Sequence, residues 1–183
     1  MKRLAVAAAA ALLAACSANA PPATQTVRST VSISSQDMAG NTTIESFQDV
    51  GGTTHQLGVA PDQVWAVLPA VYQGLGIAVG TSLPDARTIG NTKLVLNRTL
   101  AGKPLSTFLS CGEGPTGTPL ADSYRVNMAL VTMLNPTPGG GTRVETRVGA
   151  SATNRAVSGA PVSCTTTGRL EALIAERIKN QLG

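Results

Sequence analysis

The chain has 183 residues, of which 43% are hydrophobic, 3% aromatic and 13% charged, with 14 Lys+Arg against 10 Asp+Glu. This length suits one globular domain, and the small share of charged residues argues against a disordered acidic or basic tail protein. No apolar run reaches the roughly 18 residues of a membrane-spanning helix.

The N-terminus has the pattern of an export signal. Lys2 and Arg3 supply positive charge, and residues 4–15 are an uninterrupted run of Leu, Val and Ala that is too short to cross a bilayer. The run ends in Leu13-Ala14-Ala15-Cys16, which resembles the lipobox of bacterial lipoproteins. The resemblance implies cleavage before Cys16 and acylation of that residue, which gives a stable anchor once two or three chains are attached. The alternative is an ordinary secretory signal with a Cys there by chance.

The same resemblance suggests how the chain is divided and where it resides. Residues 1–15 are expected to be a signal peptide, 16–26 a lipidated N-terminus with a flexible tether, and 27–183 a single domain. Ser17 follows the cysteine, and in lipoproteins of Gram-negative bacteria a residue other than Asp at that place favours the outer membrane. We therefore expect a protein of the cell envelope that faces the periplasm and is held to the membrane by its lipid.

Two strands and a helix are expected in the first part of the domain. Apolar and polar residues alternate from Thr26 to Ile33 and, less regularly, from Thr42 to Val50. Pro61 to Leu75 is the clearest helix, because proline suits a first helical turn and apolar residues recur every three or four positions. Pro69 is expected to bend or split this helix near Leu68. The apolar stripe consists of Val64, Leu68, Val71 and Leu75.

Strands and a final helix are expected in the rest of the chain. Ile77–Val79, Thr88–Leu100 and Leu105–Cys111 have strand patterns, and a Gly-Lys-Pro turn predicts that the last two pair as a hairpin. Residues 112–119 are Gly- and Pro-rich and predict a loop. Alternation from Ser123 to Leu134 and from Thr142 to Ala152 predicts two antiparallel strands. The C-terminal helix is expected over 167–182, with its apolar face formed by Leu170, Ile174, Ile178 and Leu182.

These elements predict a two-layer α+β fold, in which an antiparallel sheet packs against two helices. Their order, together with the sequence Ala60-Pro61-Asp62-Gln63-Val64-Trp65, resembles START-like helix-grip domains. It is also similar to small domains of accessory lipoproteins in the outer-membrane barrel assembly machinery. The resemblance implies either a partner-binding domain or a module that holds an apolar ligand between sheet and C-terminal helix.

The cysteine count agrees with export. With Cys16 acylated, Cys111 and Cys164 remain, and an even remainder in an oxidising compartment predicts one disulfide that joins the entry of the last helix to the sheet. The alternatives are two free thiols or a redox pair. The Cys-x-x-Cys motif of redox enzymes is absent from the sequence.

Few residues suggest chemistry. Residues 112–117 match G-x-G-x-x-G, but prolines and a missing strand–helix context favour a plain loop. His55 is the single histidine, and neither G-x-S-x-G nor S-x-x-K is present, so we expect a surface-loop residue rather than part of a triad. One histidine and two bonded cysteines do not form a metal set. We expect no enzyme, catalytic residue, metal ion or cofactor.

The charged residues of the domain fit a solvated sheet face. Asp122 with Arg125, and Glu145 with Arg143 or Arg147, are expected to form surface ion pairs. Arg98 belongs with these three arginines on one face, which either meets an acidic partner or polysaccharide or is simply solvated. Without Lys2 and Arg3, 12 basic and 10 acidic residues remain, which does not favour nucleic-acid binding.

The sequence therefore predicts a lipid-anchored envelope protein with a non-catalytic partner-binding or structural role, and possible partners among envelope proteins. The alternative is a helix-grip module for an apolar small molecule or lipid. The sequence gives no oligomeric state.

Overall fold

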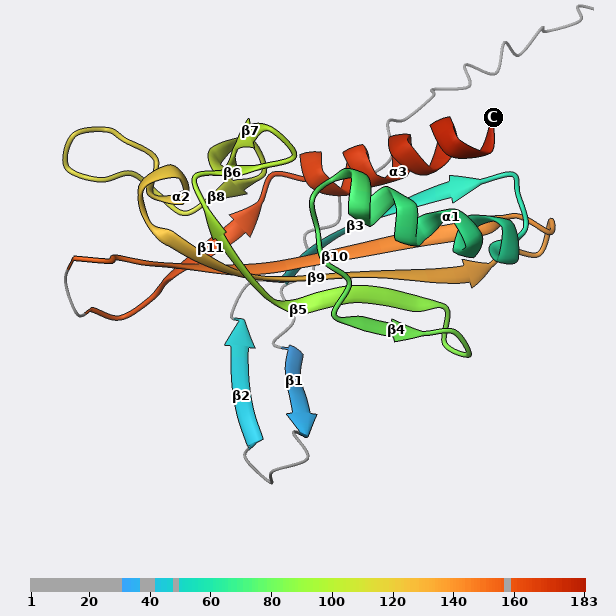
Figure 1. Ribbon diagram of the computed structural model, residues 1–183, viewed down its shortest axis with the longest axis horizontal. Helices are drawn as coiled ribbons and strands as arrows, with labels where there is room; N and C mark the ends of the chain where they lie inside the picture. The colour runs from blue at the N-terminus through green and yellow to red at the C-terminus, as the bar shows by residue number, and fades with distance from the viewer. Residues whose placement is uncertain (1–30, 37–41, 48–49, 157–158) are drawn as a thin grey trace, which may run out of the picture.

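The computed structural model describes residues 31–36, 42–47, 50–156 and 159–183. The expected signal peptide, the lipidation site Cys16 and the tether lie outside these ranges. Within them the protein has mixed α+β architecture, with an antiparallel sheet covered by helices on one side (Figure 1). This confirms the predicted two-layer fold class.

The central sheet has seven antiparallel strands in the order β4-β5-β9-β10-β11-β8, with β3 beside β11 on the same edge of β10. Strand β10 pairs with β9 along its whole length, and its other edge pairs first with β3 and then with β11. The strands of the central sheet are β3 (Val50–Leu57), β4 (Thr81–Leu83), β5 (Thr88–Asn97), β8 (Leu109–Ser110), β9 (Arg125–Pro136), β10 (Thr142–Thr153) and β11 (Val162–Thr166).

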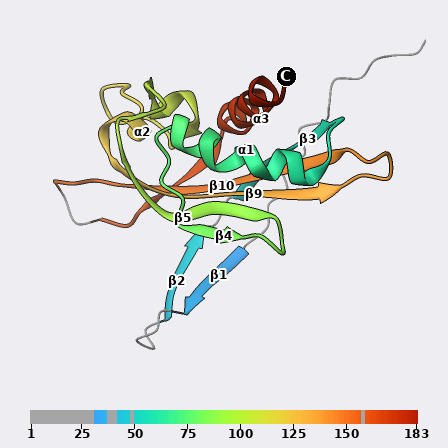
Figure 2. The same ribbon diagram turned by 45° about the vertical axis from the view of Figure 1, so that its right-hand side comes forward.

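Two long helices cover one face of this sheet. These are α1 (Pro61–Gly74) and α3 (Arg169–Leu182), which contact each other above β9 and β10 (Figures 1 and 2). The antiparallel pair β1 (Val31–Gln36) and β2 (Thr42–Phe47) lies on the opposite side of the sheet in both views, and β2 contacts β10. We call the side without helices the helix-free face.

The core forms between the helices and one parity of the strands. The even-numbered residues of β9 and β10 point to the helices, and all of them except Pro136 are buried, as the alternation predicts. The predicted stripes of both helices are buried against them, except that Leu182 is half-buried. Large side chains with an exposed fraction of 1% or less include Leu68, Tyr72, Leu75, Met128, Leu130, Leu170, Ile174 and Ile178.

The first helix does not split at Pro69, and one strand expected among the described residues is absent. Helix α1 runs from Pro61 to Gly74 without a break, because Pro69 lies on its exposed face, where water can hydrate the carbonyl group that loses its hydrogen bond. Residues 77–79 form no strand, and the edge strand begins at Thr81. The expected Thr26–Ile33 strand lies outside the described residues up to residue 30, and its last residues fall in β1.

The predicted hairpin between 88–100 and 105–111 is also wrong. Ala101 and Gly102 adopt positive φ angles and form a tight turn, which closes only the short pair β6 (Thr99–Leu100) and β7 (Lys103–Pro104). The chain then makes the 3-10 turn η1 (Leu105–Thr107), which buries Leu105, and β8 joins β11 instead. The short helix α2 (Leu120–Ser123) follows the loop at 112–119.

Candidate functional site

The two cysteines of the domain come together, as the cysteine count predicts. Cys111 lies at the end of β8 and Cys164 in β11, with Cα atoms 4.1 Å apart and the sulfur atoms at disulfide distance. Both are buried. Strand β11 leads into α3 (Figure 1), so the pair ties the entry of this helix to the edge of the sheet.

His55 is not in a surface loop as expected. It lies in β3 opposite Val144, a buried residue of the helix-facing parity, and its side chain is half-buried. Nε2 lies 3.5 Å from Oγ1 of Thr53. Burial, and then the positive charge of Lys179 on α3, hold the pKa of His55 below its usual value. The Gly-rich residues before it misled the prediction, because β10 pairs with them and extends β3 back to Val50.

The expected ion pairs form in part. Arg147 and Glu145 are 2.6 Å apart at their nearest charged atoms, as expected. Asp122 instead accepts hydrogen bonds from the backbone N–H and the hydroxyl group of Ser106, at 2.8 and 2.6 Å. Its carboxylate therefore fixes the turn at η1.

Three of the four grouped arginines lie on the helix-free face, but they are spread along it. Arg143 pairs with Asn135 at one end of the sheet, Arg147 with Val131 near the middle, and Arg125 with Thr153 at the other end. Arg98 lies in the turn after β5, with φ 65°. The G-x-G-x-x-G match at 112–117 is a loop closed by a bridge between Glu113 and Pro119, as expected.

A row of buried hydroxyl groups connects α1 to the sheet. The hydroxyl groups of Tyr72 and Thr132 are 2.9 Å apart, and those of Thr132 and Thr146 are 3.0 Å apart. All three side chains are at most 1% exposed. Burial raises the pKa of Tyr72 to about 12, against a smaller lowering by the Thr132 hydroxyl. The alternation predicts that both threonines face the core, but their pairing with Tyr72 depends on the tertiary fold.

Helix α3 begins with a buried carboxyl group. Oε1 of Glu171 accepts a hydrogen bond from the Thr166 hydroxyl at 2.7 Å, and Oε2 has no partner among the described residues. Burial raises the pKa of Glu171, although the Thr166 hydroxyl and the backbone N–H of Glu171 itself lower it. This residue stood out in the sequence only as an acid in the first turn, where it complements the helix dipole.

The helix-free face carries an apolar patch, formed by Leu83, Val95, Val131 and Met133. Leu83 pairs with Thr88, and Thr88 pairs in turn with Met133, so these side chains lie on one face of the sheet. Val95 pairs with Asn127, which lies on that same face. Leu83 is 51% exposed and Val95 58%, while the other two are half-buried. Gly90 lies between them opposite Val131, and a Cβ there would come within 2.9 Å of the Val131 Cα. Gly90 thus leaves the side chain of Val131 uncovered on the β5 side.

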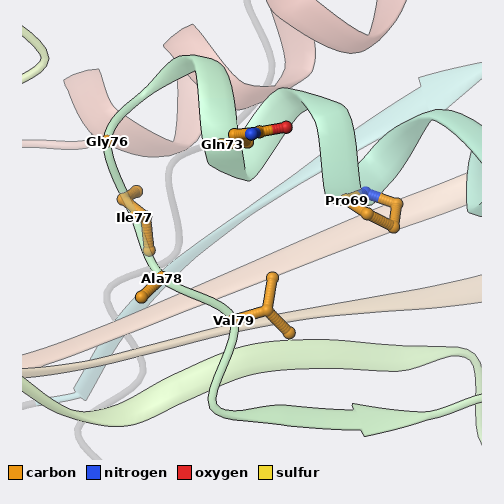
Figure 3. Close-up of a pocket in the computed structure, with 6 residues that line it drawn as sticks. All are labelled: Pro69, Gln73, Gly76, Ile77, Ala78 and Val79. Carbon is orange, nitrogen blue, oxygen red and sulfur yellow. The ribbon is translucent and has the colours of Figure 1, made fainter.

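Two hollows lie at other places. One, of about 420 Å³, is bounded by Pro69 and Gln73 of α1 and by the segment Gly76–Val79 that leads to β4 (Figure 3). The second, which we call the polar hollow, has about 440 Å³ and is bounded by Asn97, Arg125, Asn154 and Arg155. Asn97 ends β5, Arg125 begins β9, and the other two follow the end of β10.

No protein-family model and no curated protein matches the chain. Among the described residues, no three His, Cys, Asp or Glu side chains lie together as a metal site would require. None of the described helices is long and apolar enough to cross a membrane.

Proposed function

We propose that the protein is a lipid-anchored component of the cell envelope, whose domain binds another envelope protein through the apolar patch and catalyses no reaction. The observation that carries this proposal is the patch itself. Two large apolar side chains, Leu83 and Val95, are more than half exposed on the same face, with Val131 and Met133 between them. Large apolar side chains exposed on one sheet face are typical of a protein–protein contact.

Packing inside the domain supports an external partner over an internal apolar ligand. Leu170, Ile174 and Ile178 of α3 have no exposed area, and neither do Leu130 and Val144 of the sheet beneath. A void as large as a water molecule would leave area exposed on such side chains. A ligand in the helix-grip position would therefore have to displace packed side chains, at a cost of several kcal/mol. We retain the helix-grip resemblance as a proposal for the topology, not for a ligand chamber.

Local chemistry supports binding over catalysis. Among the described residues, the groups that affect the His55 ring are a hydroxyl group and a cation, and none of these residues is a carboxylate that orients the ring or raises its pKa as in a hydrolytic triad. For the anchor, the support is the sequence Leu13-Ala14-Ala15-Cys16 together with the paired cysteines, since disulfides persist in oxidising compartments.

The anchor is tested by producing the wild-type chain and the Cys16→Ser variant in a Gram-negative bacterium. We expect the wild-type protein to float with membranes and to carry acyl chains on residue 16 in intact-mass measurements. The variant should lose both properties. Wild-type protein with an unmodified Cys16 thiol in the soluble fraction would contradict the proposal.

The partner is tested with a photo-crosslinking amino acid placed at Val95 in intact cells. We expect a discrete adduct with an envelope protein from this position. The matched control is Arg177, which is exposed on α3 on the other side of the molecule. Equal adducts at both positions, or none at Val95, would exclude the patch as the binding surface.

A further inference from the structure

We propose that the polar hollow binds an oxyanion, a phosphate group borne by a molecule larger than the free ion. This inference does not depend on the anchor or on the apolar patch. It rests on which hydrogen-bond donors and acceptors of Asn97, Arg125, Asn154 and Arg155 are used within the protein and which remain for a ligand.

The hollow is built on the ends of three neighbouring strands. Asn97 and Arg125 are direct cross-strand partners, and Arg125 also pairs with Thr153, the last residue of β10. Paired residues share one face of the sheet, so the side chains of Asn97 and Arg125 lie next to each other. Asn154 and Arg155 follow Thr153 directly. Strand ends hold such groups more firmly than a long loop would.

Internal hydrogen bonds engage the acceptors of the hollow. Oδ1 of Asn97 accepts a hydrogen bond from the guanidinium group of Arg155. Oδ1 of Asn154 accepts one from the backbone N–H of Ala156 at 2.9 Å, while its Nδ2 donates to the hydroxyl group of Tyr124 at 3.3 Å. What remains is mainly donors: the Arg125 guanidinium, the rest of Arg155, and amide N–H groups of both asparagines. A ligand that satisfies them must be rich in acceptor oxygens.

The charge of the hollow points the same way. Its four side chains carry two positive charges and no negative one. The carboxylates nearest in sequence are engaged elsewhere, because Asp122 binds Ser106 and Glu145 pairs with Arg147. Guanidinium groups form paired hydrogen bonds with phosphate and carboxylate, and these charge-assisted bonds are the strong ones. The volume of about 440 Å³ leaves room for a body of sugar size behind the anionic group.

A phosphorylated sugar and a lipid headgroup offer the same oxyanion, and the experiment separates them. The full chain, purified in a non-ionic detergent without a sugar headgroup, is titrated with glucose 6-phosphate, with glycerophosphoglycerol and with glucose. Binding is followed by calorimetry and by NMR of the side-chain amide groups of Asn97 and Asn154. We expect saturable binding of at least one phosphate probe, with a Kd on the order of 1 mM, and none of glucose. Which of the two probes binds identifies the source.

Variants locate the site. Replacing both Arg125 and Arg155 by Gln should weaken binding at least about tenfold, the size expected for lost charge-assisted hydrogen bonds. The matched control is Arg143→Gln, an exposed arginine at the opposite end of the same face, which should bind as the wild type does. All of these residues are on the surface, so the variants should fold, which circular dichroism checks. Three results would each overturn the proposal: no saturation by either phosphate probe, unchanged binding by the double variant, or equal loss in Arg143→Gln.

Discussion

Glu171 places a carboxyl group in the interior at the start of α3, where only one of its oxygens has a partner among the described residues. Burial raises its pKa above the value of 4.5 expected in the unfolded chain. The folded protein therefore holds this proton at a pH where the unfolded chain has released it. The stabilisation is fully present below the unfolded pKa and is lost as the pH rises through the folded pKa.

The variant Glu171→Gln, which resembles the protonated state, should make this effect visible. At about pH 4 the variant and the wild type should differ little in free energy of unfolding, and the wild type should become the less stable one as the pH approaches 7. Urea denaturation across this range measures the difference. His55 acts in the opposite direction, because its lowered pKa costs stability below about pH 6.5, but it contributes equally to both proteins. Glu176→Gln, on the exposed side of the same helix, should show no such trend. A difference that does not change with pH would contradict the assignment.

At the scale of elements, the docking of α1 on the sheet depends on the hydroxyl row. Tyr72→Phe should lower the free energy of unfolding by about 1 kcal/mol, because its hydroxyl group no longer bonds Thr132 or the backbone carbonyl of Ile89, while Thr132 keeps Thr146 as a partner. Thr132→Val should cost more, about 2 kcal/mol, since it leaves the hydroxyl group of Thr146 buried without this partner. The double variant should lose less free energy of unfolding than the two single variants lose together, because Thr132→Val no longer removes a partner of Tyr72 once that hydroxyl group is gone. Urea denaturation of the four proteins gives the coupling, and strict additivity would show that the row does not act as a unit.

The same scale shows which elements local sequence can predict. Long elements with one buried side, such as α1, α3, β9 and β10, repeat their apolar residues at the helical or strand period, so their faces were predictable. The short strands β4, β8 and β11 are defined by their partners, and few residues cannot establish a period. The Leu105–Cys111 run was assigned to the wrong partner for this reason, since its alternation does not specify which edge it joins.

Sites were harder to predict than elements. Arg125 was expected on one sheet face with three other arginines, and this expectation did not give its neighbours in the structure. Asn97 and Arg155 are 58 positions apart and meet only through the register of three strands and the turn after β10. No local pattern indicates such a contact. The cysteine pair could be predicted because only two cysteines remain once Cys16 is set aside, so only one pairing is possible.

For the whole molecule, the decisive constraint is the bond between Cys111 and Cys164. The loop that it closes spans 53 positions and contains β9 and β10, the two longest strands of the sheet. Closing a loop of that size in the unfolded chain corresponds to about 4 kcal/mol in the loop-entropy relation. The bond also fixes β11, and with it the first turn of α3, against β8. Both effects favour the folded state, the first through the unfolded chain and the second through the edge of the sheet.

Removal of the bond should therefore destabilise the entire domain rather than one edge. We expect the Cys111→Ser/Cys164→Ser variant to lose about 2–4 kcal/mol of free energy of unfolding in urea, in one cooperative transition. A thiol reductant should lower the stability of the wild type toward that of the variant and leave the variant unchanged, which separates the bond from the substitutions themselves. A wild-type protein that is insensitive to reductant and has two thiols available to alkylation would show that the cysteines are free. Oxidation would then stabilise nothing, and the paired cysteines would no longer support export to an oxidising compartment.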